Sequence, residues 1–299
     1  MRVFVTGATG HVGSAVVRDL LDAGHEVVGL ARSAASAAAL AEVGAAVHRG
    51  DVDDLDSLRA GAAAADGVVH AANKHITETT DQAARARAEL AAVEAIGREL
   101  EGTGKPFAVT SGVIGRTPGT LLTEETPTVP NALTALRLPV EAATLALAER
   151  GVRSSSIRLA PTVHGPGDAR GFIALLVGTA RTAGVSGYVG DGANRWPAVH
   201  RRDAATVFRL ALESAPAGTR AHAVAEEGVP FRAIAEAIGH ALALPAASVP
   251  AEEASGHFGL LAPLVSLDSP TSSALTRDLL GWRPRHPALL ADIAAGVYS

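Results

Sequence analysis

Cysteine is absent from the chain of 299 residues, and aromatic residues make up only 3% of it. Without cysteine there can be no disulfide framework, no thiolate nucleophile and no zinc site built on thiolates. Charged residues make up 19%, and the formal net charge is −5, with both signs scattered along the chain. A protein that binds nucleic acid normally carries a basic patch, and none occurs here. We therefore expect no nucleic-acid partner, and we assign no metal ligands.

Long apolar runs are also missing. The first residues form a short apolar stretch, residues 2–6, which is followed directly by glycines. A signal peptide needs a longer apolar stretch and a cleavage site of small residues, and a membrane-spanning helix needs ~20 consecutive apolar residues. Hydrophobic residues nevertheless make up 47% of the chain, enough for a sizeable core. We expect a cytoplasmic protein with no membrane partner.

The first half of the chain alternates short β-branched runs with longer stretches that are rich in alanine and leucine. Nearly continuous apolar strands that alternate with helices are typical of a parallel sheet covered on both faces, so the pattern predicts an α/β fold. The expected strands are residues 3–6, 26–30, 46–48, 67–71, 107–110 and 154–159. The expected helices are residues 11–23, 35–43, 55–65, 82–100 and 132–150.

The rhythm changes after residue 160, where glycine and proline become frequent and the helices alternate with less regular segments. We expect residues 1–160 to form the large α/β domain, with later elements at about 195–225 completing its sheet. Residues 161–299 are expected to form mostly a smaller lobe that faces the substrate. Asp203 precedes a run of apolar residues and is expected to cap the helix that starts there.

The strongest motif is the sequence TGATGHVG at residues 6–13, between the first expected strand and the first expected helix. Gly7 permits a tight turn, Gly10 lets the backbone approach a pyrophosphate, and Gly13 lets the helix pack closely on the strand. The helix N-terminus also presents N–H groups and a positive dipole end to an anion. The motif predicts a bound dinucleotide cofactor, with contacts from Gly7, Thr9, Gly10, His11, Val12 and Gly13.

The Gly-x-x-Gly-x-x-Gly spacing resembles that of the extended and atypical short-chain dehydrogenase/reductases, the group similar to NAD-dependent epimerases and dehydratases. Several independent motifs extend the resemblance over nearly the whole chain. It implies a Rossmann-type, doubly wound parallel sheet with a smaller C-terminal substrate lobe. It also implies hydride transfer between a nicotinamide cofactor and a small-molecule substrate.

The end of the second expected strand distinguishes NADP(H) from NAD. NAD-binding domains usually carry Asp or Glu there for the ribose 2′-hydroxyl, but this chain has Ala31 followed by Arg32. A guanidinium can bind a 2′-phosphate that a carboxylate would repel. Arg32 and Ser33 therefore predict NADP(H) as the cofactor, the alternative being that Arg32 is an ordinary exposed arginine.

The resemblance implies further cofactor contacts at the ends of the following strands. Asp51 matches the residue that accepts a hydrogen bond from the adenine amine, the alternative being a helix-capping role. His70 is interpreted as a core histidine. The other positions implied to contact the cofactor are Val52, Ala71, Ala72, Asn73, Thr110 and Pro161.

The catalytic residues of the family are only partly present. Ser111 matches the serine that orients the substrate oxygen, the alternative being a serine that satisfies local backbone groups. The family's tyrosine and lysine would fall on Thr134 and Leu138, and no Tyr-x-x-x-Lys occurs in the chain. Three explanations are open. Another group supplies the proton, or the hydride goes to an acceptor that needs little help from an acid, or the protein binds the cofactor without catalysing a reaction. The candidate proton donors are Tyr188, His164 and His75, and Lys74 could partly replace the lost ammonium.

Two residues are expected on the substrate side. Trp196 lies among glycines in a chain with few aromatics, a position that favours pocket lining over core packing. Arg137 could bind the ribose or a substrate anion, or be an ordinary exposed arginine. We predict an NADP(H)-dependent oxidoreductase acting on a small carbonyl or related polarised substrate, as a monomer or homodimer. The alternatives are a non-catalytic NADP(H) sensor of the NmrA type and a sugar epimerase or dehydratase.

Overall fold

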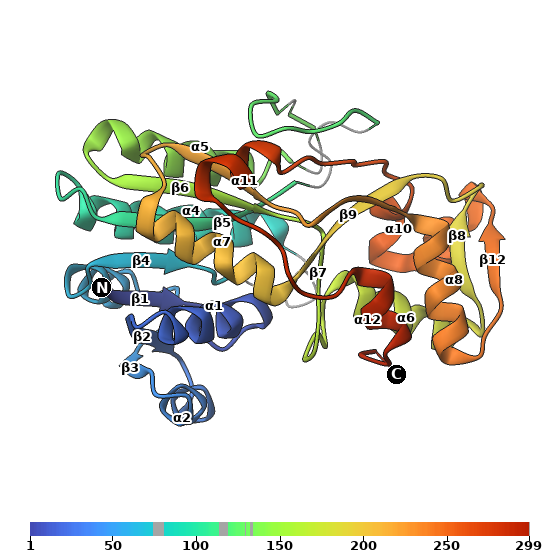
Figure 1. Cartoon of the computed structure of the whole chain (residues 1–299), viewed down its shortest axis with the longest axis horizontal. Helices are drawn as coiled ribbons and strands as arrows, with labels where there is room; N and C mark the ends of the chain where they lie inside the picture. The colour runs from blue at the N-terminus through green and yellow to red at the C-terminus, as the bar shows by residue number, and fades with distance from the viewer. Residues whose placement is uncertain (74–80, 114–118, 129, 132–133, 299) are drawn as a thin grey trace.

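A computed structural model describes residues 1–73, 81–113, 119–128, 130–131 and 134–298. Its centre is a seven-stranded sheet with the order β10-β6-β5-β4-β1-β2-β3, in which every pair of neighbours is parallel. This order confirms the predicted Rossmann-type fold (Figure 1). The strands are β1 (Arg2–Thr6), β2 (Glu26–Ala31), β3 (Ala46–Arg49), β4 (Gly67–His70), β5 (Pro106–Gly112), β6 (Arg153–Leu159) and β10 (Thr219–Ala223).

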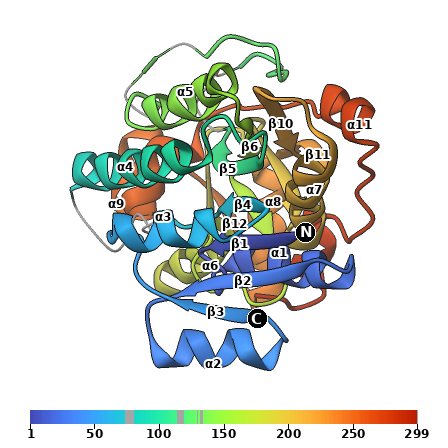
Figure 2. The ribbon, with the colours of Figure 1, turned by 90° about the vertical axis from the view of Figure 1, so that its left-hand side faces the viewer.

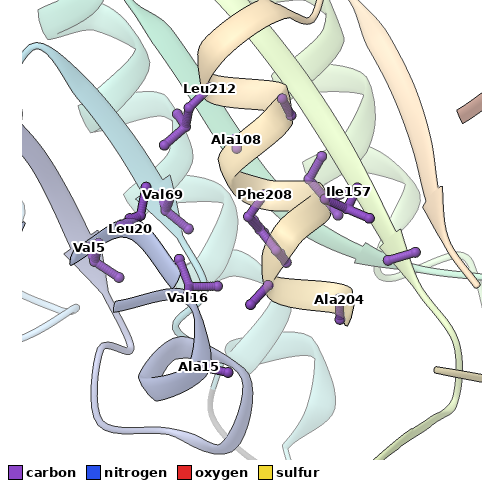
Figure 3. Packing of buried hydrophobic residues seen from close by; sticks show 14 of the residues in the cluster. Val5, Ala15, Val16, Leu20, Val69, Ala108, Ile157, Ala204, Phe208 and Leu212 are labelled. Atoms are coloured by element: carbon purple, nitrogen blue, oxygen red, sulfur yellow. The ribbon is translucent and has the colours of Figure 1, made fainter. Parts of the chain in front are cut away.

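Helices cover both faces of this sheet (Figure 2). One face packs on α1 (His11–Asp22) and α7 (Arg201–Ser214), and the other on α3 (Leu55–Ala63), α4 (Gln82–Leu100) and α5 (Leu138–Ala146). Side chains alternate along a strand, so Val3 and Val5 belong to the first core and Phe4 to the second. Figure 3 shows the first core, where Phe208 and Leu212 of α7 meet Leu20 of α1 over the strands. Helix α2 (Ala34–Glu42) packs at the β2–β3 edge.

The second lobe contains two small sheets and its own apolar core (Figure 1). One sheet has the order β11-β9-β7, and the other pairs β12 with β8. The strands are β7 (Thr162–His164), β8 (Ser186–Val189), β9 (Arg195–His200), β11 (Glu226–Pro230) and β12 (Ala246–Val249). The helices of this lobe are α6 (Phe172–Ala183), α8 (Phe231–Leu242), α9 (Ala254–Phe258), α10 (Ala262–Val265) and α12 (Leu289–Ala294). Helix α11 (Ala274–Leu280) packs back on the large domain. Short 3₁₀ helices cover residues Leu147–Arg150, Ala251–Glu253 and Gly259–Leu261. Within the described residues, no helix is both long and apolar enough to span a membrane.

The expected helix at residues 132–150 starts later than predicted, because α5 begins at Leu138. Pro139 explains this, since proline has no N–H and fits an α-helix only in its first turn. Thr134 consequently lies in a turn before the helix, where its amide donates to the Asn131 side chain at 3.2 Å. The position that matches the family's tyrosine is thus outside α5.

Two expectations for residues 195–225 are corrected. Strand β10 does join the large sheet beside β6, but β9 lies in the three-stranded sheet of the lobe. Asp203 does not cap α7, which begins at Arg201 and is capped by the His200 side chain. The Asp203 carboxylate instead accepts hydrogen bonds from the backbone amides of Arg285 (2.9 Å) and His286 (3.0 Å). It therefore anchors the C-terminal segment to the start of α7.

Candidate functional site

The glycine turn is pressed between the end of β4 and the first turn of α1. Gly7 has a φ of +67°, and a Cβ at this position would lie 2.6 Å from the backbone nitrogen of Ala72. A Cβ on Gly13 would lie 2.0 Å from the Gly7 carbonyl oxygen. Both distances are far below van der Waals contact, and a positive φ also favours glycine. Only glycine therefore fits at these two positions.

The N-terminus of α1 is open to a ligand. Gly10 is the capping residue, with an extended backbone (φ −74°, ψ 174°) and no side-chain hydrogen bond to the first turn. A helix start leaves N–H groups unsatisfied and carries a partial positive charge, which suits a phosphate. We call the closely packed turn at Gly7 and Gly13, where no Cβ fits, the cradle. The cradle and the uncapped helix end together fit the diphosphate of a dinucleotide. The turn residues Gly7, Thr9, Gly10, His11, Val12 and Gly13 surround this position.

The cradle is tied to β4 through Thr6 and His70. The Thr6 hydroxyl lies 2.9 Å from His70 Nδ1 and accepts a hydrogen bond from the Ala72 amide at 3.4 Å. Burial, together with the nearby charge of Arg137, lowers the pKa of His70 to about 4. The imidazole is therefore neutral at physiological pH. These bonds set the path of residues 71–73, three of the expected cofactor contacts.

The ends of β2 and β3 carry the residues expected at the 2′-phosphate and the adenine. The Arg32 side chain is 79% exposed, and its Nε lies 3.7 Å from Asp51 Oδ2. Asp51 does not cap the next helix, because Asp54 caps α3 by accepting from the Ser57 amide. Its carboxylate accepts from the Asp53 amide at 3.1 Å and stays beside Arg32. Arg32 and Asp51 thus lie side by side at this edge of the sheet, where the 2′-phosphate and the adenine of the cofactor are expected.

Ser33 has a structural role that the sequence did not indicate. Its hydroxyl accepts from the Ser36 amide at 3.1 Å and forms a capping box at the start of α2. Arg49, at the end of β3, donates to the carbonyl oxygen of Ser33 at 2.6 Å and to that of Arg32 at 3.4 Å. Sequence analysis missed Arg49. The signal was available, because parallel neighbouring strands end at the same edge of a sheet.

Ser111 lies near the end of β5, where its side chain is 7% exposed and its backbone is in register with Arg158 of β6. The Thr110 hydroxyl is buried and has no hydrogen-bond partner among the described residues. Leu138 opens α5 and Thr134 precedes it. Neither side chain can act as an acid or a base, so the two positions expected to match the family's tyrosine and lysine carry no acid–base group.

Arg137 points inward instead of toward solvent. Its Nη2 atom lies 3.0 Å from Glu89 Oε1 of α4 and donates to the Thr110 carbonyl oxygen at 3.4 Å. The Glu89 side chain is only 5% exposed. Burial raises the pKa of the Glu89 carboxyl, an effect that Arg137 and Arg85 oppose. An acid–base group thus lies beside the end of β5.

Glu89 was also missed by the sequence analysis, although a signal existed. It falls on the same helical face as Ala92, Val93 and Ile96, which are all buried. A single carboxylate in an apolar stripe with this spacing indicates a buried charge with a partner or a function. The abundance of alanine in α4 obscured the stripe.

The structure does not bring Tyr188 to the catalytic edge. Tyr188 lies on β8, at the end of the lobe opposite the large sheet, with the Arg232 guanidinium 5.6 Å from its ring centre (Figure 1). Its expected role as proton donor to a substrate held at Ser111 is therefore wrong. His75, another candidate donor, and Lys74, expected as a partial replacement for the lost ammonium, lie outside the described residues.

His164 lies inside the lobe. It is 1% exposed on β7, and its Nδ1 is 2.6 Å from Asp292 Oδ2 of α12. Its Nε2 lies 4.0 Å from Glu226 Oε2, and its ring packs edge-on against His200 at 5.5 Å. This environment ties α12 to β7, and no contact within the described part of the chain directs the ring toward Ser111. Pro161 lies just before β7 and stays a predicted cofactor contact.

Trp196 belongs to the core of the lobe and not to a substrate pocket. Its side chain is fully buried and packs on the rings of Phe172 (5.8 Å) and Phe231 (4.9 Å). It lies in β9 and points to the inner face of the lobe. The expectation that it lines a pocket is wrong, because neighbouring aromatic residues from α6 and α8 close over it.

Comparisons with known proteins agree with this geometry. The model of the NAD dependent epimerase/dehydratase family matches residues 3–224. An uncharacterized protein of Schizosaccharomyces pombe is 47% identical over all of both chains, and one of Saccharomyces cerevisiae is 42% identical over 99% of this chain and 98% of its own.

Solved structures share the fold at low identity. The dTDP-glucose 4,6-dehydratase of Streptomyces venezuelae, solved with NAD, superposes with a TM-score of 0.80 at 22% identity, over 99% of this chain and 96% of that one. The UDP-glucose 4-epimerase of Thermus thermophilus, also with NAD, gives a TM-score of 0.78 at 22% identity, over 99% and 98%.

Proposed function

The chain belongs to the NAD dependent epimerase/dehydratase family, and on that premise we propose that it is an NADP(H)-dependent oxidoreductase. It transfers a hydride to or from a small carbonyl or a related polarised substrate. The observation that carries the proposal is the cradle at Gly7 and Gly13, where no side chain fits and α1 opens toward the diphosphate. Binding of a dinucleotide is the first requirement of the proposed reaction.

The choice of NADP(H) rests on charge at the end of β2. Ala31 places no carboxylate at the end of β2, and the Arg32 guanidinium is largely exposed where the 2′-phosphate would lie. Asp51 Oδ2 lies 3.7 Å from Arg32 Nε, so a bound 2′-phosphate would have to displace or share this contact. Arg49 adds a second positive charge while bracing the turn that carries Arg32 and Ser33. Two cations at one edge favour the cofactor with the extra phosphate.

Calorimetry with NADPH and NADH tests this choice. We expect the wild-type protein to bind NADPH more tightly than NADH. The Arg32→Ala variant should bind NADPH at least ~10-fold more weakly and NADH almost unchanged, because only the charge-assisted bond to the 2′-phosphate is lost. Arg59→Ala, on the exposed side of α3, is the matched control. Equal affinities for the two cofactors in the wild type would contradict the assignment.

The residues of this chain bind the cofactor and orient the substrate. The nicotinamide, when bound, supplies or accepts the hydride. Ser111 donates a hydrogen bond to the substrate oxygen and fixes its position at the end of β5. The turn at residues 7–13 and the segment at 71–73 hold the cofactor against the edge of the sheet.

Two other functions have support from Thr134 and Leu138, whose side chains cannot serve as the acid and base that the family's tyrosine and lysine provide: a non-catalytic sensor, and an epimerase or dehydratase. A sensor of the NmrA type would bind NADPH tightly and turn nothing over. An epimerase or dehydratase would return the cofactor to its starting redox state. Following NADPH absorbance with a panel of carbonyl, quinone and imine compounds separates these alternatives from a reductase, for which NADPH is consumed in step with product.

A further inference from the structure

A small cavity lies between α4 and the ends of β3 and β4. Its lining includes Val52, Ala72 and Asn73, all expected to contact the cofactor, together with His70, Arg85 and Glu89. About 20 Å³ of it is open to water, which is room for a single water molecule. The cavity therefore adjoins the cofactor edge and opens toward solvent at the exposed residues Asp53 and Asn73.

Two buried polar atoms without partners belong to residues of this lining. His70 Nε2 and Glu89 Oε2 are both buried, and neither has a hydrogen-bond partner among the described residues. The two residues are 2% and 8% exposed. A buried polar atom without a partner costs roughly 1–3 kcal/mol, so two around one cavity indicate a ligand or water that bonds to both.

The bonding of His70 sets the direction of such a bridge. If Nδ1 accepts a hydrogen bond from the Thr6 hydroxyl, which itself accepts from the Ala72 amide, the neutral ring carries its proton on Nε2. His70 then donates to a water in the cavity. A protonated Glu89 Oε2 can donate to the same water, which then accepts two hydrogen bonds and keeps its own hydrogens to pass to a proton acceptor.

The charges around Glu89 suit a carboxyl that gains and loses a proton. Arg137 contacts Oε1, Arg85 lies one turn earlier on α4, and Asp53 faces the cavity from the segment after β3. Burial favours the neutral acid, whereas the two guanidinium groups stabilise the carboxylate once the proton has left. The Arg137 nitrogen that contacts Glu89 also reaches the Thr110 carbonyl, next to Ser111.

We propose that Glu89 is the proton-donating residue that replaces the missing tyrosine, and that it acts through the water between its carboxyl group and His70. The inference rests on the proposed function. Hydride adds to the carbonyl carbon of the substrate and the Glu89 proton reaches the carbonyl oxygen, so that C=O becomes CH–OH. Glu89 is left as a carboxylate beside Arg137 and takes a new proton from solvent. The reverse sequence serves oxidation.

A first test needs neither cofactor nor substrate. In protein labelled with ¹³C at the glutamate carboxyl carbons, the signal missing from Glu89→Gln is that of Glu89. We expect it to titrate at a higher pH than the exposed glutamates. Glu94→Gln is the same change at a side chain of α4 that is 44% exposed, and it should leave the Glu89 signal in place. A Glu89 signal that titrates with the exposed glutamates would overturn the proposal.

A second test uses turnover. Glu89→Gln should lower the rate of NADPH-dependent reduction ~10²-fold or more, while NADPH affinity by calorimetry is retained. In the wild type the rate should fall as the pH rises through the titration of Glu89, since only the protonated form donates. That pH dependence should disappear in Glu89→Gln and persist in Glu94→Gln. Glu89→Asp keeps a titrating group, so it should retain the pH dependence at a reduced rate even if the amide variant folds poorly.

The outcomes separate the two proposals. Failure of the wild-type chain to bind NADPH would overturn the proposed function, and with it this role of Glu89. NADPH binding and turnover together with a Glu89→Gln variant of wild-type rate and pH profile would overturn the role of Glu89 alone.

Discussion

Ser111 lies on the face of β5 that α4 and α5 cover. Phe107 and Val109 of the same strand belong to the core on that face, and side chains alternate along a strand, so Ser111 points the same way. That is also the side of Glu89 and Arg137. The serine expected to hold the substrate oxygen and the carboxyl proposed to supply its proton are therefore on one side of the sheet.

Ser111→Ala tests the serine by itself. Loss of the hydroxyl should lower turnover ~10²-fold or more and leave NADPH affinity nearly unchanged, because the cofactor is held by the turn at residues 7–13. Steady-state kinetics and calorimetry measure the two effects. Ser154→Ala is the matched control, since Ser154 is buried at the other end of β6 and its hydroxyl has no partner among the described residues. Turnover of Ser111→Ala at the control rate would remove Ser111 from the mechanism.

Residue roles were harder to predict than residue positions. Trp196 was placed near the substrate because large aromatics are scarce in this chain, and Tyr188 was a candidate proton donor, but the burial of one and the remoteness of the other depend on how distant elements pack. His164 was also a candidate proton donor, and its pairing with Asp292 joins residues far apart in sequence. No local pattern carries such information.

At the scale of elements, the turn between β1 and α1 is the part of the site that the sequence predicts most completely. Its geometry depends on glycines that are close in sequence, and the motif predicted the strand, the turn and the helix together. The start of α5 was predicted too early, although Pro139 is a local signal that limits where a helix can begin. The alternation of strands and helices, which is also local in sequence, predicted a parallel sheet and six of its seven strands, whereas β10 comes from residues 219–223 and joins the sheet through packing between distant segments.

Gly13→Ala should disrupt the cofactor turn. The added Cβ would meet the Gly7 carbonyl oxygen at 2.0 Å, so α1 and the turn must move apart. We expect NADPH affinity to fall by more than ~10-fold and the free energy of unfolding by about 1–3 kcal/mol. Calorimetry and urea denaturation provide the two values.

Gly178→Ala is the control for this change, because Gly178 also lies inside a helix, α6, but a Cβ there has nothing within 4 Å. That variant should bind NADPH normally and be up to ~1 kcal/mol more stable, since alanine favours helix. A Gly13→Ala protein that binds NADPH like Gly178→Ala would show that the turn is not the diphosphate site.

At the scale of the whole molecule, the C-terminal segment joins the two lobes. It leaves the large domain near Asp203, where His286 Nδ1 lies 2.8 Å from Asp203 Oδ1. It then continues into α12, which is tied to β7 by the contact between Asp292 and His164. His286 also stacks on His200 at 4.8 Å, and Tyr298 donates to Asp168 Oδ2 at 3.0 Å. Buried polar contacts therefore continue along the segment from one lobe to the other.

Asp292→Ala should weaken this connection. The Asp292 side chain is 7% exposed and pairs with His164, so its removal leaves a buried imidazole without its partner. We expect a loss of about 1–3 kcal/mol in the free energy of unfolding, measured by urea denaturation. Asp278→Ala, on the exposed side of α11, is the control and should change stability by less than ~0.5 kcal/mol. A similar small change in both variants would mean that the pair with His164 contributes little.

The place of β10 limits how this chain can be divided. The last strand of the large sheet comes from residues 219–223, after β7, α6, β8 and β9 have already been built into the lobe. A fragment that stopped near residue 160 would lack β10 and would leave β6 as an unpaired sheet edge. Such an edge is a template for pairing with another chain, so we expect that fragment to aggregate. Splitting the gene at the point where its composition changes would thus separate β10 from its partner β6, and an exchange of lobes between relatives would have to carry the later strand along.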